Sequence, residues 1–467
     1  MPKATNIIIV GAGPAGVRAA LRAAELGARA TLVTSGEFGG MAATDGPIPV
    51  RTLAHAARLI RDARQLPQYG IVVSEPVLDY SQLLARVHDV VEDVRAHSSR
   101  RQDFDSLGIT VHEDAGAARF LDPNTIETQS GLRLQAEASI LCTGGVSRRL
   151  PIPGFELTCT HSDAWGLKAV PQSMLVIGAG ATGVQVASIF NAFGTHIQLF
   201  QAGPRILPTE DESVSAEVAM EFRAEGIEIR ENFGSIESFE KTAKGIRMNF
   251  SKDGSRESAE AALAVVAVGW VASTSGMDLA AAGVEINERS FVKVNKYLQT
   301  TAPHIFAAGD VTGGLMLAPQ AVEAGFVAAT NAVQGPSLPF WSEVSPIGSF
   351  TDPEYAQVGL TEAKARETYD VLTTIIRFES VARAIIDGRK GGFCKLITDR
   401  KTYRILGCHV VGERAVDITQ VAAIAISAGM KVNDFLRIPL SFPTYSGALI
   451  RAAAVAAREL NLPIGLD

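Results

Sequence analysis

The sequence is poor in cysteine, with four among 467 residues, and no two of them stand in a C-x-x-C spacing. This pattern argues against a disulfide framework, a zinc site and an external redox pair, and it is typical of the reducing cytoplasm. None of the eight histidines has a metal-ligand spacing, so we expect no metal site. The four cysteines are Cys142, Cys159, Cys394 and Cys408.

Long apolar runs are also missing, since the longest, residues 261–272, is too short to span a bilayer. A formal net charge of −7 gives no general attraction to nucleic acid or to anionic membranes. With 47% hydrophobic and 20% charged residues, the composition is that of an ordinary globular protein. The length corresponds to about three domains of roughly 150 residues. We therefore expect a cytoplasmic protein with no nucleic-acid or membrane partner.

What the sequence does contain is one phosphate-binding unit twice, at residues 7–35 and 175–202. In each copy an apolar strand runs into G-x-G-x-x-G, and a helix and a second strand follow. The first glycine permits the tight turn, the second lets the backbone approach a pyrophosphate, and the third packs helix against strand. The pattern predicts an α/β protein with two dinucleotide sites. Their residues are Gly11, Gly13, Pro14, Ala15 and Gly16 in the first copy and Gly178, Gly180, Ala181, Thr182 and Gly183 in the second.

Each copy departs from the fingerprint at one position. The acidic residue that binds the ribose 2′-hydroxyl is replaced by Thr34 in the first copy and by Gln201 in the second. A threonine hydroxyl still bonds a ribose, so a dinucleotide remains the expected ligand of the first copy. Gln201 removes the carboxylate that would repel a 2′-phosphate, so NADPH and NADH are both admissible in the second.

Further motifs extend over the rest of the chain. Thr143-Gly144-Gly145 follows an apolar strand at 138–142, and Ile305-Phe306-Ala307-Ala308-Gly309-Asp310-Val311 carries an aspartate after a strand and a turn of small residues. The stretches 353–361 and 405–412 lie in the last third of the sequence. Together these motifs resemble those of the pyridine nucleotide-disulfide oxidoreductase family, to which glutathione reductase and lipoamide dehydrogenase belong.

The resemblance implies two Rossmann-like dinucleotide-binding domains and a C-terminal α+β dimerisation domain. The FAD domain would cover 1–154 and 275–338, the NAD(P) domain 155–274 and the dimerisation domain 339–467. The family is homodimeric and uses FAD and NAD(P)H, and its aspartate at the position of Asp310 bonds the flavin ribityl chain. The other cofactor-binding residues that the resemblance implies are Ser35, Gly40, Arg51, Thr143, Gly144, Gly269, Gly309, Met316, Leu317 and Ala318.

The family's redox disulfide is absent. Counted without a gap from Gly39-Gly40, its two cysteines fall on Ala42 and Pro47, neither of which carries electrons. The histidine and glutamate that serve the thiol substrate across the dimer are replaced by Phe442 and Gly447. A thiolate and its base are useful only as a set, so their joint loss is coherent.

Further substitutions fall beside the expected flavin. The family's lysine and glutamate near flavin N5 and the nicotinamide correspond to Arg51 and Gln185. We interpret Arg51, Gln185 and Phe442 as the catalytic set. Two alternatives stay open: Arg51 as an exposed cation at a helix start, and Phe442 as a core aromatic. Arg205 could meet a 2′-phosphate, but NADH enzymes of the family carry the same Arg-Ile-Leu-Pro turn.

Three segments carry predictions of lesser weight. Ala181 stands where reductases often place a tyrosine lid, so its small side chain indicates an unlidded nicotinamide site. The cluster Glu210-Asp211-Glu212 is expected to be a solvated turn or a helix start, and residues 80–97 a long amphipathic helix.

These features predict an FAD-dependent NAD(P)H oxidoreductase that passes electrons directly to a diffusible small-molecule acceptor such as a quinone. The cysteine-less quinone reductases of the superfamily resemble the chain in the aromatic-Pro-(Ser/Thr)-x-Ser-Gly ending at 442–447. One alternative is a soluble pyridine nucleotide transhydrogenase, which shares the length and an aromatic-Pro-Thr ending. Another is a non-catalytic flavoprotein or nucleotide sensor.

Overall fold

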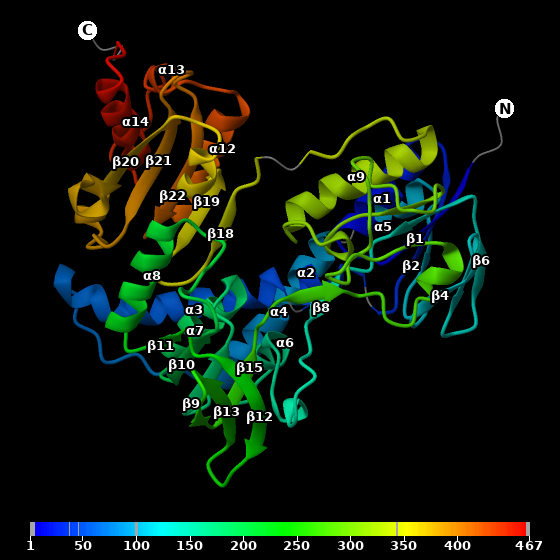
Figure 1. Ribbon diagram of the computed structural model, residues 1–467, viewed down its shortest axis with the longest axis horizontal. Coiled ribbons are helices and arrows are strands. Elements are labelled where there is room, and N and C mark those ends of the chain that lie inside the picture. Colours follow the sequence, from blue (N-terminus) through cyan, green and yellow to red (C-terminus); the bar gives the residue numbers. More distant parts are fainter. Residues whose placement is uncertain (1–4, 37, 45, 99–100, 342–343, 464–467) are drawn as a thin grey trace. The chain divides into compact units, whose positions relative to one another are not determined.

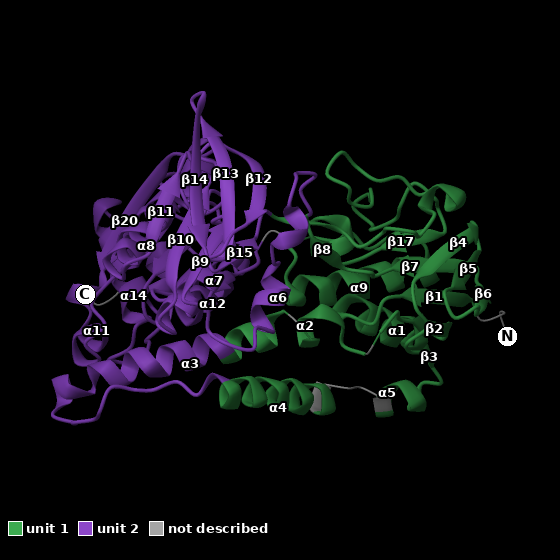
Figure 2. Ribbon diagram, turned by 90° about the horizontal axis from the view of Figure 1, so that it is seen from below, with its two compact units in different colours: residues 1–52, 81–148, 269–342 green, residues 53–80, 149–268, 343–467 purple. Residues whose placement is uncertain are grey.

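The computed structural model describes residues 5–36, 38–44, 46–98, 101–341 and 344–463. The chain divides into two compact units, each assembled from separate stretches of sequence (Figure 2). Unit 1 comprises residues 1–52, 81–148 and 269–342, and unit 2 comprises residues 53–80, 149–268 and 343–467. Both units combine helices and sheets, which confirms the predicted α/β class. The bounds of the three expected domains stay a prediction.

Unit 1 is built on a five-stranded parallel sheet in the order β17-β7-β1-β2-β3. Alternate residues of β1 enter two different cores: Ile7 and Ile9 pack with helices α1 and α9, and Ile8 and Val10 pack on the opposite face. A parallel sheet buried on both faces explains the uninterrupted apolar run at 7–10. The bounds are β1 Asn6–Val10, α1 Pro14–Glu25, β2 Arg29–Val33, β3 Thr110–His112, β7 Ala138–Leu141, β17 Ile305–Ala307 and α9 Ala318–Gln334.

Smaller elements complete unit 1. An antiparallel sheet of β4, β5 and β6 supplies part of the second core, and β8 pairs with β16. The predicted helix at 80–97 is confirmed as α4, Tyr80–Ser98. The other bounds are α2 Gly40–Thr44, α5 Arg101–Ser106, β4 Ala118–Asp122, β5 Thr125–Thr128, β6 Arg133–Gln135, β8 Gly145–Ser147, β16 Trp270–Ala272, η3 Leu279–Ala282 and η4 Asp310–Thr312.

Unit 2 contains the second phosphate-binding unit, on a four-stranded parallel sheet in the order β11-β10-β9-β15. An antiparallel sheet of β12, β13 and β14 packs its apolar side chains against β9 and β15. The bounds are η2 Phe155–Leu157, α6 His161–Trp165, β9 Ser173–Ile177, α7 Ala181–Ala192, β10 His196–Gln201, α8 Glu212–Ala224, β11 Glu228–Glu231, β12 Ser235–Lys241, β13 Ile246–Lys252, β14 Ser255–Ala261 and β15 Leu263–Val266.

The C-terminal part of unit 2 is a five-stranded antiparallel sheet in the order β18-β19-β22-β21-β20 (Figure 1). Helix α12 packs on β19 and β22, and α14 packs on β20 and β21. The bounds are β18 Ile347–Ser349, β19 Tyr355–Gly359, α10 Glu362–Arg366, β20 Val371–Arg377, η5 Phe378–Ser380, α11 Ala382–Ile386, β21 Phe393–Asp399, β22 Ile405–Val411, α12 Ala415–Ser427, α13 Val432–Phe435 and α14 Gly447–Glu459.

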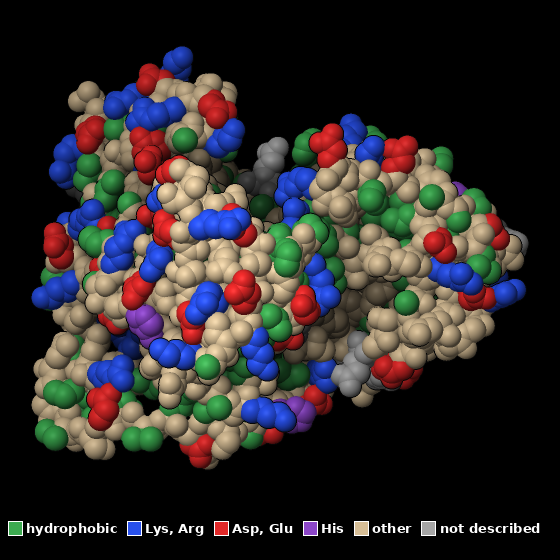
Figure 3. All heavy atoms as spheres, turned by 60° about the horizontal axis from the view of Figure 1, so that its bottom comes forward, with side chains coloured by type: hydrophobic (Ala, Val, Ile, Leu, Met, Phe, Trp, Pro, Cys, Tyr) green, Lys and Arg blue, Asp and Glu red, His purple; other side chains and the backbone are tan. Residues whose placement is uncertain are grey.

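Helix α3, Pro47–Gln65, contains the point in the sequence, between residues 52 and 53, where the chain passes from unit 1 to unit 2. The 3-10 turn η1, Leu66–Tyr69, follows the helix. Across the residues that the structure describes, no helix is both long and apolar enough to cross a membrane. Acidic and basic side chains are interspersed over the face that Figure 3 presents.

Candidate dinucleotide-binding sites

The first position of each fingerprint accepts only glycine, because the backbone that follows a neighbouring strand lies very close to it. Gly11 and Gly178 have φ angles of 108° and 97°, a region that side chains other than glycine rarely adopt. A Cβ on Gly11 would lie 2.2 Å from the Cys142 carbonyl oxygen, and one on Gly178 would lie 2.4 Å from that of Ala267. Only glycine therefore permits the turn at the end of β1 and of β9.

The third glycine of each fingerprint lets the helix approach the turn. A Cβ on Gly16 would lie 1.8 Å from the Gly11 carbonyl oxygen, and one on Gly183 would lie 1.8 Å from that of Gly178. These distances are far below van der Waals contact, so helices α1 and α7 pack directly on the backbone that precedes them.

The second glycine of each fingerprint faces open space. A Cβ on Gly13 or Gly180 would meet no other described heavy atom within 4 Å, apart from chain neighbours. Both residues are N-caps, and a glycine has no side chain with which to bond the first N–H groups of α1 and α7. Unpaired helix N–H groups beside such a space bind anions. The two turns thus fit the pyrophosphates of two dinucleotides, with Pro14, Ala15, Ala181 and Thr182 in the first helical turns.

Other predicted flavin residues of unit 1 lie around the first turn. Gly40, which begins α2, has a φ angle of 60°, and a Cβ there would lie 2.7 Å from the Cα of Gly13. Thr143 follows β7, and its buried Oγ1 has no hydrogen-bond partner among the described residues. A buried hydroxyl without a partner is uncommon, so this atom fits a hydrogen bond to a bound cofactor. Gly144, next in the chain, has a φ angle of 76°.

Asp310 begins the turn η4, which is separated from the end of β17 by Ala308 and Gly309. Burial raises the pKa of its carboxyl group. A Cβ on the preceding Gly309 would lie 3.1 Å from the Ala15 Cβ, so this turn packs on the start of α1. A half-buried carboxyl group beside the phosphate cradle fits an acceptor for the hydroxyl groups of FAD.

The remaining predicted cofactor-binding residues of unit 1 lie at the ends of its elements. Thr34 is buried after β2, where its N–H donates to the His112 carbonyl oxygen at 3.0 Å, and Ser35 is exposed. Met316 and Leu317 precede α9, Leu317 is its N-cap and Ala318 is its first residue. Gly269 precedes β16 and accepts from the Arg148 N–H at 2.9 Å.

In the second copy, the Gln201 side chain bonds the backbone of the glycine-rich turn. Its Oε1 accepts a hydrogen bond from the backbone N–H of Ala179 at 3.1 Å. Arg205 is similarly engaged, because its guanidinium donates to the carbonyl oxygens of Leu207, Pro208 and Glu210 at 3.0–3.1 Å. The Arg205 side chain therefore holds a loop in place and does not point freely to a 2′-phosphate.

The three residues interpreted as catalytic lie on separate elements. Arg51 is exposed in α3, and Gln185 in α7 donates from Nε2 to the Ala181 carbonyl oxygen at 3.1 Å. Phe442 follows β22 and α13 in the chain, and 86% of its surface is exposed. Its interpretation as a core aromatic is therefore wrong for the described chain. Ala181 is exposed at the start of α7.

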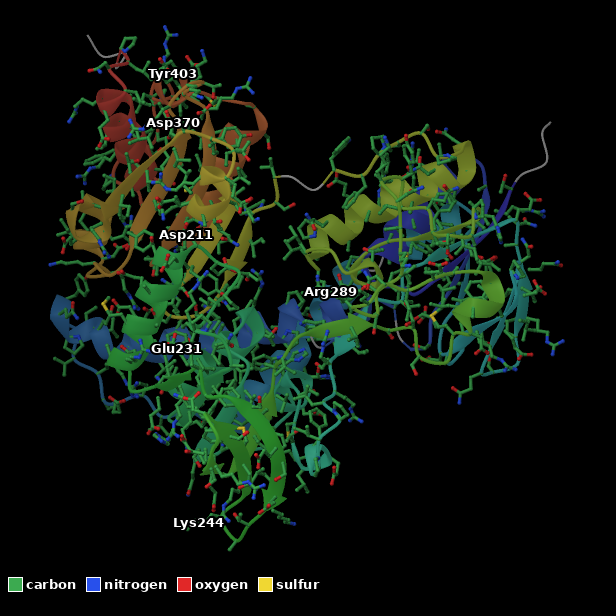
Figure 4. The ribbon with its side chains drawn as sticks, in the orientation of Figure 1. Asp211, Glu231, Lys244, Arg289, Asp370 and Tyr403 are labelled. Carbon is green, nitrogen blue, oxygen red and sulfur yellow. The ribbon has the colours of Figure 1, made fainter. Side chains whose placement is uncertain are left out.

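The acidic cluster at 210–212 differs from the expectation of a solvated turn. Asp211 does begin a helix, since it caps α8 by accepting from the Ser213 N–H at 3.1 Å. However, Glu210 and Asp211 are 6% and 2% exposed. Asp211, whose place at the start of α8 is seen in Figure 4, pairs with Lys395, a buried cation in β21 whose Nζ lies 2.7 Å from Asp211 Oδ1. A lysine inside the apolar strand at 393–399 was the one signal of this pairing.

The cysteines are another feature that spacing alone does not reveal. Cys394 in β21 and Cys408 in β22 are both buried, and their sulfur atoms lie 3.9 Å apart. Strand pairing brings them together, because Leu396 pairs with Cys408 and Cys394 with Val410. All four cysteines are free thiols.

Two open phosphate cradles, each between a parallel strand and a helix, define a protein that binds two dinucleotides. The family model described as "Pyridine nucleotide-disulphide oxidoreductase" matches residues 5–325, and that of the family's dimerisation domain matches residues 345–453. The chain belongs to the pyridine nucleotide-disulphide oxidoreductase family. It is accordingly an FAD-dependent protein that uses NAD(P)H, and its dimerisation domain supports a homodimer.

Similar proteins have several activities. A dihydrolipoyl dehydrogenase of Thermus scotoductus is 32% identical, with 98% of each chain covered, and a mercuric reductase of Lysinibacillus sphaericus is 30% identical, covering 97% of this chain and 83% of that protein. Among solved structures, LpdA from Mycobacterium tuberculosis is 25% identical with a TM-score of 0.86, covering 97% of this chain and 99% of LpdA. The flavoprotein disulfide reductase RclA from Escherichia coli, at 24% identity and a TM-score of 0.85, covers 96% and 99% and shares the fold.

Proposed function

We propose that this protein is an NAD(P)H:quinone oxidoreductase without a sulfur relay. The observation that carries the proposal is the presence of Ala42 in α2 and Pro47 at the start of α3, where the family's two redox cysteines are expected. Neither side chain accepts electrons. The overall reaction is NAD(P)H + H⁺ + quinone → NAD(P)⁺ + quinol, which balances without a protein thiol.

FAD, when bound, supplies the two-electron carrier between the nicotinamide and the acceptor. The chain's own residues bind and orient the reactants. The turns at Gly13 and Gly180 hold the two pyrophosphates, and Asp310 and Thr143 provide hydrogen-bonding groups for the flavin nucleotide. Arg51 supplies a positive charge in the segment that the resemblance assigns to the flavin.

Phe442 supports an apolar, planar acceptor. With 86% of its surface exposed, the Phe442 side chain is available for contact with a bound ligand or a second copy. In the family this position faces the active site of the partner subunit. Phe442 and Gly447 offer no titrating group there, and a quinol can take its protons from water. Disulfide reduction needs a base at that site, so the substitutions favour a quinone.

The test is an anaerobic titration of the purified protein with NADH and NADPH, followed by reoxidation with quinones, nicotinamides and disulfides. We expect the flavin to be bleached and quinones to reoxidise it fastest. Faster reoxidation by a disulfide would refute the proposal, and rapid hydride exchange between NADPH and a nicotinamide analogue would identify a transhydrogenase. An unbleached flavin would identify a non-catalytic flavoprotein.

Variants sharpen this test. Phe442→Ala is expected to raise the KM for quinone while the rate of flavin reduction by NADH stays unchanged. The control is Ile424→Ala, which removes a 70% exposed apolar side chain from α12 of the same antiparallel-sheet region. An equal change of the quinone KM in both variants would contradict the role of Phe442.

A further inference from the structure

Helix α3 begins in the part of the sequence that is expected to contact the flavin, and it continues into unit 2. It is continuous over the 19 residues Pro47–Gln65, with Arg51 near its start and Arg61 near its end. Ten residues of α-helix cover about 15 Å. Arg51 belongs to unit 1. Arg61 belongs to unit 2, as do all residues of the helix after residue 52.

Arg61 binds helix α7 of the second phosphate-binding unit. Its Nη2 donates to the Ser188 carbonyl oxygen at 2.9 Å and lies 3.4 Å from Ser188 Oγ. Its Nε lies 3.4 Å from a carboxylate oxygen of Asp352, and the Asp352 N–H donates to Ser188 Oγ at 3.0 Å. Arg61, Ser188 and Asp352, named here the Arg61 clamp, thus each contact the other two. Asp352 Oδ2 also lies 3.6 Å from Arg389 Nη1.

Burying the charged Arg61 side chain in the Arg61 clamp costs free energy of desolvation. Only 13% of the Arg61 side chain is exposed, and burial lowers the pKa of its guanidinium, an effect that Asp352 partly opposes. Ser188 is 1% exposed. A buried charge is weak support for stability, because its desolvation offsets the attraction to its partner. A role in fixing geometry accounts better for its presence.

The geometry that it fixes involves Gln185. Ser188 lies three residues after Gln185 in α7, so the two are neighbours on one side of the helix. Arg58, one turn before Arg61 on α3, is also partly buried and ion-paired. Its ion-pair partners among the described residues are Asp62, Glu354 and Glu413, none of them on α7. Arg61 is therefore distinguished from Arg58 by its contact with α7.

We propose that Arg61 is a positioning residue for hydride transfer. The Arg61 clamp holds α7, which carries Gln185 and the nicotinamide cradle, on the part of α3 that belongs to unit 2. Hydride transfer requires reacting atoms about 3–3.5 Å apart, and a misplacement of about 1 Å costs roughly a hundredfold in rate. This inference rests on the proposed function only in assuming that NAD(P)H transfers a hydride to the flavin. It does not depend on which acceptor then oxidises the flavin.

The test compares Arg61→Met and Ser188→Ala with the matched control Arg58→Met. The flavin-reduction rate at saturating NADH is measured by anaerobic stopped-flow absorbance, and NAD⁺ binding to the oxidised protein is measured by calorimetry. We expect Arg61→Met to slow reduction by about tenfold or more, and Ser188→Ala by a smaller factor, while the NAD⁺ dissociation constant changes less than about twofold. Arg61→Lys, which keeps one donor, should restore part of the rate.

The outcomes separate positioning from stability. Wild-type reduction rates in Arg61→Met, or equal slowing in Arg58→Met, would overturn the inference, as would a wild-type flavin that neither NADH nor NADPH reduces. A purely structural role would lower the thermal midpoint without this split between rate and affinity. Failure of quinones as acceptors affects only reoxidation, so it would refute the proposed function and leave this inference standing.

Discussion

Lys395 and Asp211 form an ion pair inside unit 2, with Nζ and Oδ1 2.7 Å apart and side chains 3% and 2% exposed. The same Nζ lies 2.7 Å from Glu362 Oε2 and donates to Ser213 Oγ at 3.1 Å. Asp211 Oδ2 also accepts from the Glu362 N–H at 3.0 Å. One lysine therefore joins β21 to the starts of α8 and α10.

Removing this lysine should destabilise the protein strongly. In Lys395→Met the Asp211 carboxylate stays buried without its cation, and loss of one partner of a buried pair costs about 3–5 kcal/mol. The free energy of unfolding of unit 2, followed by urea denaturation and amide hydrogen exchange in α8, measures the loss. The control is Lys364→Met, whose ion pair with Glu367 is exposed and is worth at most about 1 kcal/mol. Equal effects of the two substitutions would contradict the assignment.

Glu210 should make stability fall as the pH rises. Burial raises the pKa of its carboxyl group to about 7, above the value of 4.5 for an unburied group. The folded state therefore holds the proton more tightly, and stability is lost as the pH rises from about 4.5 through 7. Glu210→Gln should remove this slope and gain stability relative to the wild type at pH 8. The exposed Glu212→Gln is the control, and parallel pH profiles of wild type and Glu210→Gln would refute the prediction.

The glycine geometry predicts opposite outcomes for two neighbouring substitutions in the second copy. Gly180→Ala adds a methyl group to open space at a φ angle of −78°, so the chain should fold and bind FAD but lose affinity for NADH. Gly183→Ala places a Cβ 1.8 Å from a backbone oxygen and should prevent folding. Circular dichroism, flavin absorbance and NADH titration distinguish the two. Tight NADH binding by Gly180→Ala would show that the phosphate lies elsewhere.

Asp310→Ala should weaken FAD binding. Hydrogen bonds to a charged group contribute about 1.5–3 kcal/mol, which corresponds to a loss of affinity of roughly ten- to a hundredfold. The fraction of FAD retained after dialysis measures the change, and thermal unfolding of the apoprotein verifies that the fold persists. Full flavin retention would remove Asp310 from the site.

Arg205→Gln should leave the choice between NADH and NADPH unchanged, because three carbonyl oxygens already occupy the guanidinium. The ratio of the two dissociation constants, measured by fluorescence titration, is the readout. A selective loss of NADPH binding would show that Arg205 leaves its loop to meet the 2′-phosphate.

The local signals in the sequence predicted the two phosphate-binding units well. Apolar strands at 7–10 and 175–177 next to G-x-G-x-x-G specify strand, turn and helix within a few residues, and β1-α1-β2 and β9-α7-β10 confirm them. Steric limits on the backbone carry this information, so no distant partner is needed.

The features that the sequence does not predict depend on contacts between residues far apart in the chain. Asp211 and its cation are 184 residues apart, so the sequence shows an acidic cluster where the structure has a buried pair. Cys394 and Cys408 meet only through the register of β21 and β22. The sequence leaves Phe442 ambiguous because an aromatic residue suits a core as well as a binding surface. Its exposure excludes the core of the described chain, and its place at a substrate surface stays a prediction.

The burial of the native thiols has a practical consequence. Cys142, Cys394 and Cys408 are buried, and burial, helped by the nearby Asp163, raises the pKa of the half-buried Cys159. Thiolates react and thiols do not, so an alkylating dye should label the folded protein slowly. A single cysteine introduced by Ala42→Cys or Pro47→Cys would then be labelled by the dye selectively. Its signal would report on the segment around residues 42–47, with little labelling of the native cysteines.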